Sequence, residues 1–337
     1  MEQELEEKKV EKRFSNIVNV SGYLRENNLE LVKDKEGKPV ISGSFTIAVT
    51  EDESHKMRVY LKQPADMKVE KDAKRWDAMK ALLPTNTISI ASYLKSNPTA
   101  DFAVASSMST KVWAVGSMEE YVRKENGKEL STTTLRVMRA GVRTASDKPF
   151  NPGASFQVDV YIESMNPEIV DEQETGRVIL VGLVPLYKYF GKFTFVAPAE
   201  NNVAQYILDH YNVTDTTRLF GKLSCVKHSK AKAETGNYFG QVSTPQYETT
   251  FVREKIITGG SAESINCDEP NAITKDEVRE GLTGREAKML EADKKSTSKP
   301  ANTGFSAAAK PASVTPAVSK PSEGFDPMNW DGLGDMF

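Results

Sequence analysis

Between Phe14 and Ile257, apolar and polar residues alternate along the chain and β-branched residues are frequent. A period of two is typical of strands with one buried face, and glycines and turn residues separate such runs here. In the first half of this region the pattern predicts five strands, at 14–24, 39–50, 55–63, 110–122 and 130–142. The Asn-Gly pair at 126–127 predicts a hairpin between the last two.

A helical period interrupts the alternation after the third of these strands. Over 69–83, the residues Val69, Ala73, Trp76, Met79 and Leu83 are spaced to share one face of a helix. The following segment, 86–107, alternates again. It predicts either an additional strand inserted into the first unit or a different position for the fourth strand.

The same order of elements then recurs. Strands are predicted at 154–162, 175–187, 189–198, 217–229 and 246–258, with a helix at 200–211 that carries Val203, Ile207 and Tyr211 on one face. Phe193 and Phe195 are expected in the core, and Lys188 and Lys192 outside it. Three strands, a helix and two strands is the order of the OB-fold. The predicted fold class is therefore mainly all-β, with two OB-fold-like five-stranded barrels at 14–148 and 149–260.

The chain changes character outside the two barrels. Residues 1–13 form a charged extension, and the TKDE and TGRE motifs at 274–277 and 283–286 predict capping boxes of short helices near 275–281 and 284–295, within 261–295. Residues 296–324 are rich in Ser, Ala, Pro, Thr and Lys. Such a composition buries too little apolar surface to offset its ordering entropy, so we expect a disordered linker in the C-terminal tail.

Bulk composition says more about the cellular compartment of the protein than about its function. The formal net charge is −3, and the two cysteines suggest neither a disulfide nor a metal framework, which fits a reducing compartment. The charged N-terminal residues lack the apolar region of a signal peptide, and no apolar run approaches the length that spans a bilayer. We therefore expect a cytoplasmic protein, bacterial or in the cytoplasm of a phage-infected host.

Motifs of catalysis are missing from the sequence. The three histidines are dispersed, and no P-loop, GxSxG or HExxH pattern occurs. Acidic pairs fall in loop-like stretches, where solvated carboxylates are the simpler explanation. The expectation is a protein that is not an enzyme and uses no cofactor or metal.

The third predicted strand, HKMRVYLKQ, suggests a binding surface. Alternation puts Met57, Val59 and Leu61 on one face, and the other face carries Lys56, Arg58, Tyr60 and Lys62. Cations that follow phosphates beside a ring that stacks on a base suit single-stranded nucleic acid, on a strand that OB-folds use for oligonucleotides. An exposed strand face that is basic only to prevent edge pairing is the alternative.

Other stretches favour nucleic acid. Within the second unit, 218–232 contains five basic residues and no acidic one. It leads into the connection between that unit's fourth and fifth strands, a region that OB-folds use for ligands. Besides the third strand, the candidate single-stranded DNA contacts are Trp113, Arg123, Lys124, Arg136 and Arg139 in the first unit, and Lys227, Lys230, Lys232, Tyr238 and Phe239 in the second.

The segment 325–337, FDPMNWDGLGDMF, combines carboxylates with large apolar groups and contains no basic residue. Large aromatic groups are unusual in a segment that only stays solvated, so a docking peptide is predicted. Its candidate contacts are Phe325, Asp326, Trp330, Asp331, Asp335, Met336 and Phe337.

Taken together, the basic OB-fold units, the Ser/Ala/Pro-rich linker and the acidic, Phe-terminated tip resemble the single-stranded DNA-binding proteins of bacteria and phages. The stretch NIVNVSGYL…GKPVISGSFTIAV within 16–49 is similar in rhythm to their opening strands. Two OB units in one chain and an Asp-Met-Phe ending depart from the usual bacterial form and suggest a phage-type or divergent member.

The resemblance implies a protein that coats single-stranded DNA and can self-associate. It also implies that the tip competes with DNA for the basic groove and recruits replication, recombination or repair enzymes such as a polymerase, helicase or recombinase. Two alternatives stay open, a structural or scaffolding protein of a virion and an OB-fold regulator that binds RNA.

Overall fold

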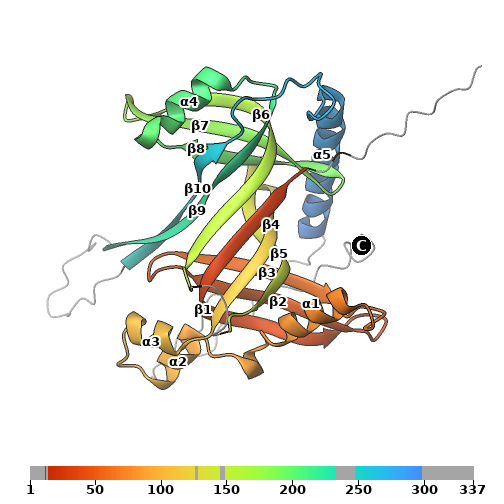
Figure 1. Cartoon of the computed structure of the whole chain (residues 1–337), viewed down its shortest axis with the longest axis vertical. Helices are drawn as coiled ribbons and strands as arrows, with labels where there is room; N and C mark the ends of the chain where they lie inside the picture. Colours follow the sequence, from red (N-terminus) through yellow and green to blue (C-terminus); the bar gives the residue numbers. More distant parts are fainter. Residues whose placement is uncertain (1–11, 13, 126–127, 145–148, 232–246, 298–337) are drawn as a thin grey trace, which may run out of the picture.

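The computed structural model describes residues 12, 14–125, 128–144, 149–231 and 247–297. Within these residues ten strands form one continuous sheet that closes on itself twice. Figure 1 shows the two closed units one above the other, with the N-terminal unit below. The predicted mainly-β fold class is confirmed.

The lower barrel contains the first five strands. They are β1 (Asn16–Lys33), β2 (Pro39–Ala48), β3 (Ser54–Lys62), β4 (Lys111–Glu125) and β5 (Lys128–Val142). Their order is β2-β3-β5-β4-β1, and pairing of β1 with β2 closes the ring. Only the β3–β5 pair in this ring is parallel, and this is the connectivity of the OB-fold.

The upper barrel repeats this topology. Its strands are β6 (Gly153–Val170), β7 (Gln173–Leu186), β8 (Tyr189–Ala197), β9 (Thr216–Ala231) and β10 (Tyr247–Gly260). They pair in the order β6-β7-β8-β10-β9, β9 returns to β6, and the β8–β10 pair is again the parallel one. Phe193 and Phe195 lie in the core as predicted, and Lys188 and Lys192 are exposed.

Two backbone links join the barrels. The first is an antiparallel pairing of β1 with β6, from Asn16↔Val158 to Ser21↔Gly153. In the second, the β9–β10 hairpin leaves its own barrel and reaches the turn between β2 and β3, where Glu53 and Val226 form a bridge and the Lys227 amide donates to the Asp52 carbonyl at 2.8 Å. Figure 1 shows this hairpin descending towards the lower barrel. We call the outer part of it, 224–231 with 247–254, the β9–β10 arm.

Each barrel carries the helix that the periodicity predicts between its third and fourth strands. In the lower barrel α1 (Glu70–Lys80) buries Trp76 and Met79 in the common core, although Val69, at its N-cap, is 47% exposed. In the upper barrel the 3-10 turn η2 (Glu200–Asn202) leads into α4 (Val203–His210), which buries Ile207.

The prediction of an additional strand within 86–107 is wrong. This insertion contains the short turn η1 (Pro84–Asn86) and two helices, α2 (Ile90–Ser96) and α3 (Phe102–Met108). Ser89 caps α2 through a capping box with Ser92, and the Asp101 carboxylate accepts from the Val104 amide at the start of α3. These side chains satisfy the first free amides of each helix, an effect that alternation alone does not register. The fourth strand lies where it was predicted.

One long helix replaces the two short ones expected after the second barrel. The first predicted capping box is confirmed, because the Thr274 amide donates to Glu277 at 2.8 Å at the start of α5 (Lys275–Thr297). The second is wrong. The Thr283 hydroxyl donates to the Arg279 carbonyl one turn earlier, inside the continuous helix.

Helix α5 holds the two barrels together along one side of the molecule (Figure 1). Its Arg285 guanidinium donates to both carboxylate oxygens of the buried Glu120 on β4, at 2.8 and 2.7 Å, and pairs with Glu129 on β5. Closer to its N-terminus, α5 packs on the turn between β7 and β8. A Cβ atom at Gly284 would lie 2.4 Å from the Lys188 carbonyl oxygen, so this contact requires glycine.

We predict that Gly284→Ala destabilises the protein by about 1–3 kcal/mol, because the added methyl group must displace either the helix or the backbone at Lys188. The comparison is Thr283→Ala, an exposed neighbour in the same turn, which is expected to leave stability within about 0.5 kcal/mol. Urea unfolding of both variants measures the effect. A Gly284→Ala protein as stable as wild type would show that α5 does not rest on this turn.

Candidate nucleic-acid interface

The outer surface of the lower barrel gathers most of the cations predicted on its strands. On β3, Met57 and Val59 are buried, and Lys56, Arg58, Tyr60 and Lys62 lie on the opposite face, as alternation predicted. Arg58 is directly opposite Arg136 of β5 in the parallel ladder. Two guanidinium groups from strands far apart in sequence therefore lie on the same surface.

The neighbouring β4–β5 ladder extends this surface. Arg139 is opposite Val115, and Trp113 is opposite Gly141. The indole lies across Gly141, with ring atoms 3.2–3.3 Å from the position that a Cβ atom there would occupy. Trp113 is thus held flat on the outer surface and partly exposed. We call the set Lys56, Arg58, Tyr60, Lys62, Trp113, Arg136 and Arg139 the basic face.

Charges within the basic face are only partly compensated. Arg136 donates to Glu119 at 3.2 Å. Burial lowers the pKa of Arg58, and the Glu119 carboxylate offsets only part of this effect. Lys62 lies 3.8 Å from Asp34. Glu119 is the carboxylate on the outer face of β4 next to the arginines, so cations outnumber it in this part of the surface.

Arg75 adds a cation that sequence reasoning missed. It projects from α1, and burial, followed by repulsion from Arg136 and Arg139, lowers its pKa, with Asp72 acting in the opposite direction. Its place in RWDAMK, next to the core residue Trp76, marks it as facing outward. Only the packing of α1 against β5 shows which surface it joins.

Some predicted contacts lie elsewhere or outside the described residues. Arg123 and Lys124 are at the far end of the β4–β5 hairpin, where the Lys124 amide donates to Asp293 of α5. Lys227 is exposed on the β9–β10 arm. The Lys230 side chain, Lys232, Tyr238, Phe239 and the whole segment 325–337 are outside the described part of the chain.

A second group of aromatic and cationic side chains flanks Trp113. The Phe150 ring, in the connection between the barrels, meets Tyr23 edge-on at 5.1 Å between centroids. Lys111 and Arg143 lie over the same ring, at 5.0 and 5.7 Å. Sequence reasoning missed Phe150 because it belongs to no periodic segment.

The β9–β10 arm has a comparable surface. Phe251, opposite Lys227, is 49% exposed, and the Arg253 guanidinium lies 5.8 Å from the centre of its ring. Lys255 follows on the same face at the mouth of the upper barrel, with its ammonium 5.6 Å from the Phe193 ring. Burial lowers the pKa of Lys255 to about 8, and among the described residues no carboxylate forms an ion pair with it.

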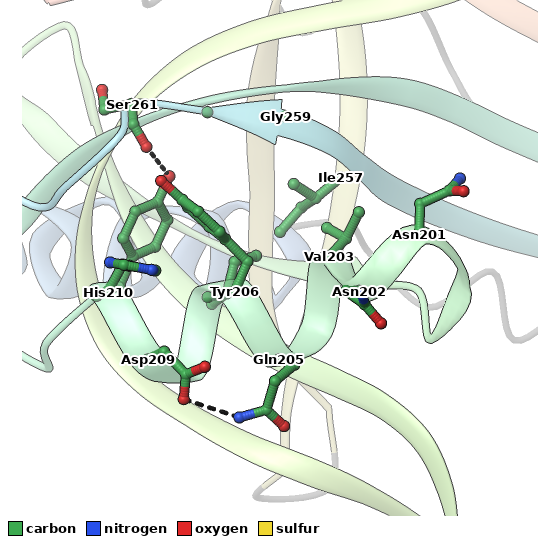
Figure 2. A pocket seen from close by; sticks show the side chains of 13 residues that line it. Asn201, Asn202, Val203, Gln205, Tyr206, Asp209, His210, Ile257, Gly259 and Ser261 are labelled. Atoms are coloured by element: carbon green, nitrogen blue, oxygen red, sulfur yellow. Dashed lines mark hydrogen bonds between the residues drawn. The ribbon is translucent and has the colours of Figure 1, made fainter.

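A surface pocket is found in a different place. It has a volume of about 620 Å³ and lies between α4 and the end of β10. Figure 2 shows that its polar groups bond to one another: Gln205 donates to Asp209 at 2.8 Å, and the Tyr211 hydroxyl to the Ser261 carbonyl at 2.6 Å. Nothing in it converges on a ligand.

The described ranges contain neither a metal-binding cluster nor a membrane-spanning helix. No group of three or more His, Cys, Asp or Glu residues there could hold a metal ion. No helix in this part of the chain is long and apolar enough to cross a membrane.

The connectivity and the basic face define the class of this molecule, a tandem OB-fold protein with a cationic, aromatic outer surface. The family model described as YorF matches residues 15–296, so the chain belongs to the YorF family. No curated protein matches it.

Among solved structures, the chain is similar to a deletion mutant and to the wild type of the single-stranded DNA-binding protein from Thermus aquaticus. Identity is 9% and 11%, and the TM-scores are 0.42 and 0.40. Both matches cover 74% of this chain, and 94% and 93% of the Thermus chains. A likeness of this size carries no argument about function.

We predict that Lys255→Met raises the melting temperature at pH 7, because wild type keeps a largely buried, unpaired ammonium in the folded state. Burial lowers the pKa of Lys255 in the folded protein to about 8, below the ordinary lysine pKa of 10.5, so unfolding takes up a proton between these values and wild-type stability rises with pH. The advantage of the variant should therefore shrink from pH 8 towards pH 10.5. Lys222→Met, on the exposed face of β9, is the control. An equal and pH-independent effect of both variants would contradict the prediction.

Proposed function

We propose that this protein binds single-stranded DNA with little dependence on sequence. The observation that carries the proposal is the basic face, where Tyr60 and Trp113 lie among cations on the strands that form the wall of an OB barrel. Cations contribute salt-dependent contacts to phosphates, and each exposed ring offers a stacking surface to any base. No side chain arrangement in the face suggests hydrogen-bond readout of one base.

Single strands fit this face better than duplex does. Tyr60 lies on a strand of the sheet and Trp113 lies flat on it, so neither projects as a helix or ribbon would to enter a groove. Stacking on them requires an unpaired base. RNA offers the same phosphates and equally flat base faces, and a contact to the 2′-hydroxyl would distinguish it. In this proposal the protein acts by binding, without catalysis, and a virion scaffold is the outcome if no nucleic acid binds.

The direct experiment titrates the full chain with fluorescent oligo-dT, duplex DNA and oligo-U over a range of salt concentrations. Oligo-dT should bind most tightly, with log affinity falling linearly with log salt. Arg139→Gln should weaken binding and reduce the slope by about 0.7, the contribution of one phosphate contact to a single strand. Arg279→Gln, an exposed arginine on α5, should change neither. Equal affinity for duplex, or a flat salt dependence, would refute the proposal.

We also infer that 325–337 recruits enzymes of replication, recombination or repair, from the aromatic and acidic side chains of that segment. Deleting it should raise affinity for oligo-dT several-fold at low salt, since its carboxylates compete with phosphates, and the gain should disappear at high salt. Phe337→Ala and Trp330→Ala should abolish capture of a cognate polymerase, helicase or recombinase and leave DNA binding unchanged. Phe305→Ala, in the linker, is the control. A tail-deleted protein that binds DNA more weakly would overturn this inference.

A further inference from the structure

The β9–β10 arm and the lower barrel are joined edge to edge. Glu53, directly before β3, bridges Val226 of β9, and Lys227 donates its amide to the Asp52 carbonyl at 2.8 Å. Because paired residues share a face of a sheet, Glu53 and Val226 lie on one side of this junction. The alternate residues, Lys56 and Arg58 on β3 and Lys227 on β9, lie on the other side.

The same alternation of side chains between the two faces continues across the arm. Lys227 is opposite Phe251 and Cys225 is opposite Arg253, so both β10 residues share the side of the basic face. Lys255, opposite Leu223, continues the row into the mouth of the upper barrel. One aromatic and two basic side chains on β10 therefore follow directly from the row on β3.

Resting on the function proposed above, we propose that Phe251 and Arg253 of the arm, together with Lys255 next to the arm on β10, form a second stacking subsite. One DNA strand would run from the basic face across the Asp52–Lys227 junction onto the upper barrel of the same chain. Phe251 would stack on a base, and Arg253 and Lys255 would bind the phosphates that follow it towards the upper barrel.

Three observations support this over a purely structural role. Phe251 is half exposed at a site where it fills no core, and Arg253 beside it is exposed as well. Arg253 forms no ion pair with a carboxylate among the described residues. The Lys255 ammonium lies over the Phe193 ring and is largely buried, and a buried ammonium with no counterion is costly unless an anion binds to it. A phosphate supplies that anion.

The opposite face of the same hairpin, on the barrel side of the arm, provides a matched control. Phe220 of β9 is 39% exposed, similar to Phe251, but it lies on the outer side, alternate to the buried Leu219 and Leu223. Phe220→Ala and Phe251→Ala remove the same ring from the same hairpin, and only the second removes it from the inferred path. Both residues are exposed enough for truncation to spare folding, and thermal melts check this.

The experiment measures anisotropy of the full chain with labelled oligo-dT of about 6 and about 25 nucleotides, chosen around the length that one OB-fold covers. The expected result is that Phe251→Ala lowers affinity for the long oligomer by about 5- to 150-fold, the range of one lost stacked base, and barely changes the short one. Tyr60→Ala should weaken both lengths, and Phe220→Ala neither.

Each alternative outcome contradicts a different part of the proposal. If Tyr60→Ala weakens binding and Phe251→Ala leaves the long oligomer unchanged, the arm subsite is wrong and the proposed function stands. If two short oligomers bind per chain and Phe251→Ala removes one of them, the arm binds a separate strand and the continuous path is wrong. If wild type binds neither oligomer, the proposed function fails and the subsite fails with it.

Discussion

Six residues of β1 paired with six of β6 set the geometry on which the rest of this structure depends. The ladder from Asn16↔Val158 to Ser21↔Gly153 is made of backbone hydrogen bonds, which fix both register and relative orientation. Given this link, each barrel extends its last hairpin towards the other. The β4–β5 hairpin reaches α5, and the β9–β10 arm reaches the β2–β3 turn. This arrangement creates a surface that spans both barrels, which neither barrel could form alone.

The two hairpins share a topology and differ in what covers them. On β4, the inward-facing Glu120 is buried beneath Arg285 of α5, with the Ser131 hydroxyl donating to it at 2.7 Å. A buried ion pair of this kind adds little net stability, but removing one partner leaves an uncompensated charge, so it defines where α5 sits. On the β9–β10 arm the corresponding face carries Phe251 and Arg253 and is exposed. The two barrels thus have one covered and one exposed hairpin face.

Much of the candidate site followed from residue parity along single strands. Alternation assigned Lys56, Arg58 and Tyr60 to the outer face because the core needs Met57 and Val59, and burial enforces that choice. Arg75 and Phe251 could not be assigned in this way. Arg75 joins the site through the packing of α1 on β5, and Phe251 through a bridge between residues 173 positions apart. Such contacts depend on how elements meet and leave no periodic signal.

The sequence by itself determined the ten strands, the helix between the third and fourth strands of each barrel, and the order of elements that defines the OB-fold. Each of these depends on a local periodicity, which arises because one face of the element is buried. It misjudged 86–107, where the capping side chains of Ser89 and Asp101 outweigh alternation, and it divided α5 at Thr283. Only the tertiary structure decided how the barrels join, where α5 packs and which face the arm presents. These features depend on backbone pairing and close packing between segments far apart in the sequence. The free energy of such contacts cannot be inferred from the residues of any one local segment.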